Sequence, residues 1–224
     1  CVRRARARAV LISALRAVLP PGVALGRADP TAPETGLWPG ESAAMRRAIP
    51  ARRREFAAGR RAARAAMQAL DVPAAAVLPG PDRAPIWPDG IIGSISHDGG
   101  ACVAIAARQG KITCLGLDLE PAEALPHDMI ETLCTKAERD AIAAHDLLGR
   151  AVFCAKEAVY KAQYPLSRQM LEFHDLETNI DLAEGHFEAR FTRACPPFQA
   201  GARMAGRIVV AQGHICALVV LYST

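Results

Sequence analysis

The stretch Phe153-Cys154-Ala155-Lys156-Glu157-Ala158-Val159-Tyr160-Lys161 predicts an amphipathic helix that carries a carboxylate and an ammonium on one side. Glu157 and Lys161 are four residues apart, so a helix places them one above the other. Phe153 precedes Glu157 by four residues, which indicates that this side is not fully solvated. Lys156 lies about 100° around the helix from Glu157 and can reach the rim of the same site. Taken alone, Glu157 and Lys161 are also typical of a surface ion pair.

A second acidic stretch, Gly116-Leu117-Asp118-Leu119-Glu120, lies upstream and predicts a strand that Pro121 ends. Successive strand side chains alternate between two faces, so the leucines share one face and Asp118 and Glu120 share the other. Two adjacent carboxylates repel one another unless a cation lies between them, and Mg²⁺ prefers hard oxygen ligands. Asp-x-Glu alone also fits a strand with solvated acids. Together, the three acids and the lysine indicate a divalent metal held against a phosphate-bearing ligand.

The bulk composition limits the class of protein. At 224 residues, the chain can form one globular unit or two small halves that share a core. No apolar run reaches about 18 residues, which excludes a transmembrane helix. Seven scattered cysteines without a C-x-x-C pair favour reduced thiols over a disulfide or zinc framework. We therefore expect a cytoplasmic protein that does not bind a membrane. The chain begins at Cys1 without an initiator Met, which is typical of a truncated sequence.

The net charge of +4 is unevenly distributed. The segment 46–64 has a single acid, Glu55, and eight arginines: Arg46, Arg47, Arg52, Arg53, Arg54, Arg60, Arg61 and Arg64. Such a helix can bind nucleic acid, a phosphorylated small molecule or an acidic protein. Aromatic residues that stack on bases are nearly absent from the segment, which disfavours single-stranded nucleic acid.

The hydrophobic periodicity predicts an α+β chain. Helices are expected at 3–19, 41–70 with a break near Pro50, 126–146 and 149–163. Thr135 and Glu138 have the spacing of a capping box. Strands are expected at 91–96, 101–107, 112–120, 172–180, 186–192, 207–211 and 215–221, and the proline-rich residues 71–90 are expected to form a long ordered loop. Because helices followed by strands occur twice, we expect two α+β halves, residues 1–116 and 117–224.

The two acidic stretches resemble the paired signature of the 4′-phosphopantetheinyl transferases, G-[IV]-D-x-E followed by [FW]-[CST]-x-K-E-[AS]-x-x-K. Leu117 replaces the commoner Ile or Val, and Cys154 the commoner Ser or Thr, which leaves the acids unchanged. Three more stretches resemble the surfactin-type subgroup that includes enterobactin synthase component D: Arg53-Arg54-Glu55-Phe56-Ala57-Ala58-Gly59-Arg60, Arg83-Ala84-Pro85-Ile86-Trp87-Pro88-Asp89-Gly90 and Gly93-Ser94-Ile95-Ser96-His97. Five stretches in the right order are far more specific than one.

The resemblance implies a fold, an activity and partners. The fold has two similar α+β halves related by a pseudo-twofold axis, with coenzyme A in the cleft between them. The first half binds the adenosine and 3′-phosphate end, and the second half binds the metal and the pyrophosphate. The enzyme transfers 4′-phosphopantetheine to a serine of an apo acyl or peptidyl carrier protein and releases adenosine 3′,5′-bisphosphate. A monomer that serves secondary metabolism and binds no nucleic acid is expected.

The resemblance also assigns roles to residues. Three acids hold Mg²⁺, or Mn²⁺ in its place: Asp118, Glu120 and Glu157. Lys161 contacts the pyrophosphate, and Lys156 is a further candidate for that contact. The adenosine and 3′-phosphate end is bound by Arg53, Arg60, Arg83, Ser96 and His97, with Arg52 as an additional candidate. Glu157 and Lys161 are the catalytic residues, and Glu157 accepts the serine proton directly or through a metal-bound water.

Other interpretations of these residues stay open. Arg53 and Arg60 are also typical of a solvated helix face, Arg83 of a loop residue that binds carbonyls, and His97 of a hydrogen-bonded turn. A non-catalytic module that docks carrier proteins or binds coenzyme A without turnover is a second hypothesis. A nucleic-acid binder that uses segment 46–64 is a third. The complete set of acids argues against both.

Overall fold

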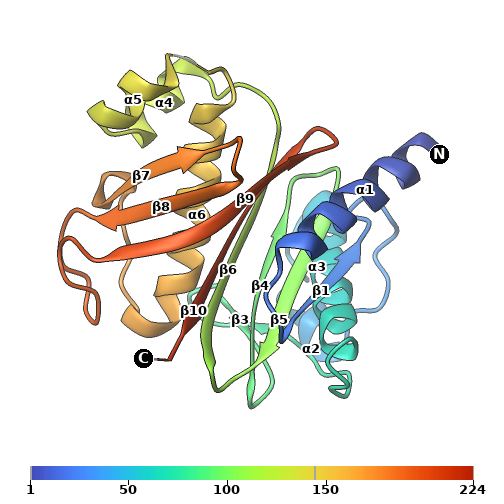
Figure 1. Cartoon of the computed structure of the whole chain (residues 1–224). Helices are drawn as coiled ribbons and strands as arrows, with labels where there is room; N and C mark the ends of the chain where they lie inside the picture. The colour runs from blue at the N-terminus through green and yellow to red at the C-terminus, as the bar shows by residue number, and fades with distance from the viewer. Residues whose placement is uncertain (1, 144, 224) are drawn as a thin grey trace. The chain divides into compact units, whose positions relative to one another are not determined.

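Helices and strands are mixed along the chain, and the predicted α+β class is confirmed (Figure 1). The computed structural model describes residues 2–143 and 145–223, so Cys1, Ala144 and Thr224 lie outside them. Contacts between Cα atoms define two compact units. The N-terminal unit comprises residues 19–115 and 222–223, and the C-terminal unit comprises residues 2–18 and 116–221. The unit boundary falls beside Gly116, and residues 2–18 group with the later segment. The predicted halves and their separate binding roles stay a prediction.

The N-terminal unit is an antiparallel sheet with a helix on it. Its sheet has the order β1-β5-β4, formed by Val23–Ala28, Cys102–Arg108 and Ile91–His97. Helix α3 (Pro50–Gln68) contacts all three strands, and its buried face is rich in alanine. The unit also contains α2 (Pro39–Ala44) and the strand pair β2 (Leu78–Pro79) and β3 (Pro85–Ile86). Pro50 is the first residue of α3, where its fixed φ suits helix initiation, so the predicted break is confirmed.

The C-terminal unit contains a larger sheet, of order β6-β10-β9-β8-β7. The strands are Ile112–Pro121, His214–Tyr222, Arg203–Ala211, His186–Phe191 and Leu176–Asp181. Helix α6 (Leu148–Ser167) packs on β7, β8 and β9 and shares their core. The other helices of the unit are α1 (Val2–Val18), α4 (His127–Leu133), α5 (Lys136–Ile142) and the 3₁₀ turn η1 (Phe173–Asp175).

Local backbone chemistry explains where the elements differ from those expected. The predicted helix 126–146 is two helices, because Cys134 is extended (φ −106°, ψ 136°) and Thr135 caps a new one. The predicted capping box is confirmed: Thr135 Oγ1 accepts from Glu138 N, and Glu138 Oε2 accepts from Thr135 N. Strand β1 was not expected, since Val23–Ala28 contains a glycine and an arginine between short apolar residues.

The helices and the cysteines bear on two of the sequence-based expectations. Within residues 2–143 and 145–223, every helix is too short or too polar to cross a membrane. No disulfide joins the described cysteines, all of which are buried.

Each unit has one glycine where a strand lies directly against helix backbone. A Cβ on Gly116 of β6 would lie 1.9 Å from the carbonyl oxygen of Ala158 and 2.9 Å from Ala162 Cβ. A Cβ on Gly26 of β1 would likewise lie 1.9 Å from the carbonyl oxygen of Ala62. Heavy atoms do not approach so closely, so both contacts require glycine. The contact at Gly116 sets how near α6 lies to the strand that carries Asp118 and Glu120.

We expect Gly116→Ala to destabilise the protein by about 3 kcal/mol or more, because a backbone carbonyl cannot rotate away from the new methyl group. Urea unfolding measures this change. Gly149→Ala in the first turn of α6 is the control: its new Cβ would lie 3.3 Å from Leu125 Cβ and meets no backbone atom, so we expect a much smaller change in stability. Equal unfolding midpoints for Gly116→Ala and the wild type would show that the contact does not constrain α6.

Candidate active site

Strand β6 and helix α6 bring Asp118 and Lys161 together. Lys161 Nζ donates to Asp118 Oδ1 at 2.6 Å and to the Leu117 carbonyl at 3.1 Å. Asp118 is buried, with 4% of its surface exposed. Burial disfavours the charge on Lys161, but Asp118 and Glu157 outweigh this effect and raise the pKa of the ammonium. Lys161 is therefore a fixed cation held by β6.

Glu120 is paired with an arginine that the sequence analysis missed. Arg150 Nη1 donates to Glu120 Oε2 at 3.1 Å, and the same guanidinium donates to the carbonyls of Glu123 and Ala124 at 3.3 and 3.4 Å. Burial and the charge of Asp118 raise the pKa of Glu120 to about 7 despite this arginine. One sequence signal was available: Arg150, Glu157 and Lys161 are spaced by seven and four residues, which places them on one helix stripe.

Glu157 belongs electrostatically to the same cluster. Burial and the charge of Asp118 raise its pKa, whereas Lys161 lowers it. Asp118 thus disfavours the charged forms of both other acids, the repulsion expected where a cation is to be bound. The carboxylates are hard ligands that suit Mg²⁺ or Mn²⁺. However, in the part of the chain that the structure describes, no three Asp, Glu, His or Cys side chains are grouped closely enough to hold a metal ion. The donor types fit a metal, and the metal site stays a prediction.

The structure gives Lys156 a different place from the one expected. Only 1% of its side chain is exposed, and its Nζ donates to Glu138 Oε2 and to the carbonyls of Leu133 and Phe173. An ammonium has three protons, so all of them are used inside the C-terminal unit. These contacts argue against the expected contact of Lys156 with a pyrophosphate, which stays untested.

In the N-terminal unit, Arg60 is the most unusual of the predicted ligands. It is 7% exposed, its Nε donates to the Val77 carbonyl at 2.8 Å, and its guanidinium lies 3.7 Å from the centre of the Phe56 ring. Burial lowers its pKa to about 10, even though Glu41 favours its charge. A buried guanidinium is stabilised by an anion, so this environment suits a phosphate.

His97 is grouped with Arg52 and not with Arg53. Its Nε2 lies 3.2 Å from Arg52 Nη1 and 4.0 Å from Glu55 Oε2. Arg53, the residue that the resemblance favours, instead donates from Nε and Nη2 to Glu34 at 2.7 and 2.9 Å. Of the two arginines near the start of α3, it is therefore Arg52, and not Arg53, that contacts His97.

Ser96 and Arg83 occupy very different surroundings. Ser96 is buried in β4, with 6% of its surface exposed. Arg83 is exposed in the turn between β2 and β3, where its backbone is left-handed (φ +68°). This conformation is strained by about 1–2 kcal/mol for a residue other than glycine, and such strain is often found at functional positions.

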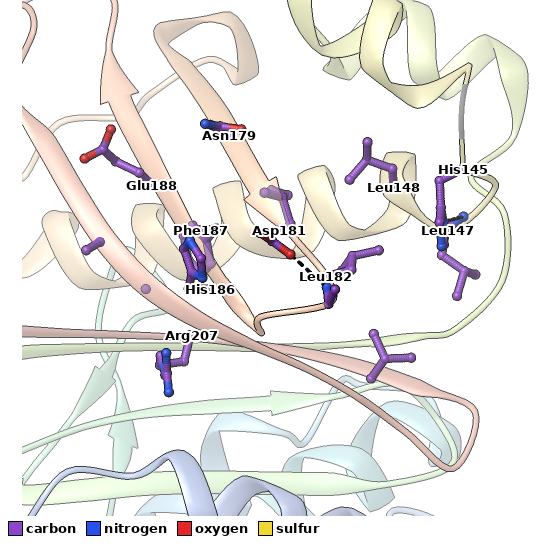
Figure 2. A pocket seen from close by; sticks show the side chains of 15 residues that line it. His145, Leu147, Leu148, Asn179, Asp181, Leu182, His186, Phe187, Glu188 and Arg207 are labelled. Atoms are coloured by element: carbon purple, nitrogen blue, oxygen red, sulfur yellow. Dashed lines mark hydrogen bonds between the residues drawn. The ribbon is translucent and has the colours of Figure 1, made fainter.

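A groove of about 1070 Å³ in the C-terminal unit does not include the acidic cluster. Figure 2 shows it between the segment before α6, with His145 and Leu147, and the sheet, with Asp181 on β7 and Arg207 on β9. Asp118, Glu120, Glu157 and Lys161 do not line it. The site therefore rests on the two motifs and not on the presence of a large cavity.

Comparisons with known proteins agree with the motifs. Residues 40–107 match the 4′-phosphopantetheinyl transferase N-terminal domain, and residues 114–219 match the 4′-phosphopantetheinyl transferase superfamily. The chain is 39% identical to 4′-phosphopantetheinyl transferase Svp of Streptomyces mobaraensis over 72% of this chain and 68% of the relative. It is 34% identical to 4′-phosphopantetheinyl transferase PptT of Mycobacterium tuberculosis over 82% and 85%.

A more distant match extends the comparison to the predicted subgroup. The chain is 33% identical to enterobactin synthase component D of Escherichia coli over 56% of this chain and 62% of the relative. Together, the two domain matches and these relatives confirm the resemblance first seen in the acidic motifs. The chain therefore belongs to the 4′-phosphopantetheinyl transferase superfamily and is an enzyme of that family.

Proposed function

We propose that this enzyme transfers 4′-phosphopantetheine from coenzyme A to a serine of an apo acyl or peptidyl carrier protein. The other product is adenosine 3′,5′-bisphosphate. The observation that carries the proposal is the charge cluster of β6 and α6, in which Lys161 is bound to Asp118 and both Glu120 and Glu157 are coupled to Asp118. The names of the relatives support the same reaction. We also expect a cytoplasmic monomer that acts in secondary metabolism and binds no nucleic acid.

The side chains of the cluster have distinct tasks in the transfer. The serine oxygen attacks the β-phosphorus of coenzyme A, and the bond from that phosphorus to the bridging oxygen breaks. Glu157 accepts the serine proton directly or through a water, and its raised pKa makes it a stronger base than an ordinary glutamate. Lys161 neutralises charge on the pyrophosphate oxygens, and its two acceptors on β6 fix its Nζ in advance.

The proposed metal is Mg²⁺ or Mn²⁺. Asp118, Glu120 and Glu157 would hold it, and it would neutralise the pyrophosphate as a Lewis acid. Lys161 already neutralises the charge of Asp118, and Arg150 that of Glu120. We therefore expect the metal affinity to depend on both cations.

The other end of coenzyme A requires anion ligands. We propose that Arg60, Arg52 and His97 bind the 3′-phosphate and the adenosine, with Arg83 and Ser96 as further contacts. The buried guanidinium of Arg60 and the proximity of Arg52 to His97 support this assignment. Arg53 is a weaker candidate, because a ligand has to compete with Glu34 for its guanidinium.

The activity is tested by incubating the protein, coenzyme A and Mg²⁺ with a panel of apo carrier proteins. We expect mass spectrometry to show the phosphopantetheine addition on a serine of at least one carrier, and chelation of the metal to prevent it. Retention of coenzyme A without any addition across acyl, peptidyl and aryl carriers would favour the non-catalytic hypothesis instead.

Replacing Asp118 tests the charge cluster. We expect Asp118→Asn to lower transfer by about a hundredfold or more, because Lys161 loses its anionic partner and the metal loses a ligand. The rate is measured with the best carrier of the panel at limiting Mg²⁺. Asp140→Asn is the control, since Asp140 forms an exposed ion pair with Lys136 in the same unit. Wild-type transfer by a folded Asp118→Asn variant would remove Asp118 from the site.

Replacing the arginines tests the anion ligands. We expect Arg52→Ala and Arg60→Ala to weaken coenzyme A binding about tenfold to a hundredfold, since a charge-assisted hydrogen bond contributes about 1.5–3 kcal/mol. Arg53→Ala is the matched comparison and should have a smaller effect because of Glu34. Calorimetric titration with coenzyme A measures all three. If Arg53→Ala weakened binding and Arg52→Ala did not, Arg53 would replace Arg52 in the assignment, as the resemblance implies.

A further inference from the structure

Lys156 of α6 and Glu138 of α5 form a buried ion pair that the proposed transfer does not use. Lys156 and Glu138 have side chains only 1% exposed, and Lys156 Nζ lies 2.7 Å from Glu138 Oε2. The ammonium also donates to the carbonyls of Leu133 and Phe173, each at 2.9 Å. Leu133 ends α4 and Phe173 begins η1, so one lysine links α6 to α4, α5 and η1.

Glu138 extends this junction to the sheet. Its Oε1 accepts from both the backbone N and the hydroxyl of Thr178 in β7, each at 2.7 Å. Its Oε2 accepts from Thr135 N, which closes the start of α5, as well as from Lys156. We call this set of contacts the Lys156–Glu138 junction. It connects α6 to four other segments of the C-terminal unit, and every one of these contacts is directional.

Stability alone does not explain such a pair. Transferring two charges out of water is unfavourable, and well-packed neutral residues often give equal or greater stability. Losing one partner is strongly destabilising, because the other charge is left buried and uncompensated. A buried pair is therefore best explained where its geometry specifies an arrangement that apolar packing would leave loose.

Small side chains make up most of the apolar packing of α6. The face that it buries is dominated by small side chains: Ala151, Cys154, Ala155, Ala158 and Ala162. Small side chains form shallow ridges, so they specify the rotation and sliding of a helix weakly. The Gly116 contact limits how near α6 lies to β6, whereas the junction binds the helix one residue before Glu157.

We propose that Lys156 and Glu138 are positioning residues for phosphopantetheine transfer. The junction sets the rotation and axial position of α6, which holds Glu157 and Lys161 against Asp118. This inference rests on the proposed function, and it gives Lys156 a role without contact to coenzyme A. A displacement of about 1 Å in a catalytic group can lower a rate about a hundredfold, so a fixed helix register matters for turnover.

The test compares a single and a double variant. Lys156→Met should lower the urea midpoint, since Glu138 is left charged and buried. Lys156→Met combined with Glu138→Gln removes both charges, so we expect most of the lost midpoint to return. In that double variant kcat should still be about a hundredfold below the wild type. The KM for coenzyme A and its calorimetric Kd should change much less than kcat, because Lys156 itself makes no ligand contact.

Lys136→Met is the control. Lys136 Nζ lies 2.8 Å from Asp140 Oδ2, close to the distance in the Lys156–Glu138 pair, but the Lys136 side chain is 82% exposed. It should change neither the midpoint nor kcat. Hydrogen exchange of the α6 amides gives a second readout that needs no carrier protein. The α6 amides should exchange faster in the double variant than in Gly149→Ala. Urea is added so that the two proteins have the same free energy of unfolding.

Two results would overturn the proposal. A double variant with wild-type kcat and wild-type α6 exchange would show that the junction does not position the helix. A tenfold loss of coenzyme A affinity with unchanged kcat in both Lys156→Met proteins would show instead that Lys156 binds the ligand directly. If the wild type modifies no carrier, the proposed function fails, and the α6 exchange then decides the junction by itself.

Discussion

The charge cluster depends on the direct contact between Gly116 of β6 and the Ala158 carbonyl of α6. A strand and a helix usually have side chains between them, but here the strand lies against helix backbone. This short distance lets Lys161, one turn beyond Glu157, reach both Asp118 and the Leu117 carbonyl. The glycine of the G-x-D-x-E motif is thus required because a side chain would clash with α6. This requirement is separate from the chemistry of the two acids. Gly26 and Ala62 repeat the contact in the N-terminal unit, without any acids nearby in the strand.

Burial, together with the charge of Asp118, then determines the electrostatics. Both raise the pKa of Glu120 and Glu157. Lys161 is paired with Asp118, and Arg150 is paired with Glu120. These two cations of α6 therefore compensate two carboxylates that are largely buried. In the proposed function, a metal that bound the acids would weaken their pairing with Lys161 and Arg150. The two cations would then be available to a pyrophosphate.

The periodicity of the sequence was sufficient for the elements that carry the site. Helices α3 and α6 and strands β4, β5 and β6 all lie where their apolar spacing predicts. The periodicity does not predict contacts between residues that are distant in the sequence. Nothing in the spacing of Arg52 and Arg53 shows that Glu34, nineteen residues upstream of Arg53, binds one of them and leaves the other beside His97. Arg150 was missed for the same reason, because its partner Glu120 is thirty residues away.

Lys156 and Lys161 show most clearly why residue type and motif are insufficient. Both belong to one signature, both are cationic, and both lie beside Glu157 in the sequence or on the helix. Their positions around the helix differ, so Lys161 faces Asp118 while Lys156 faces Glu138 and two carbonyls. Lys161 is bound to Asp118 and the Leu117 carbonyl, acceptors that a pyrophosphate would replace in the proposed function. Lys156 has all its protons bound to fixed acceptors in a dry environment, where replacement would leave Glu138 uncompensated. One motif therefore places two lysines in surroundings that suit different roles.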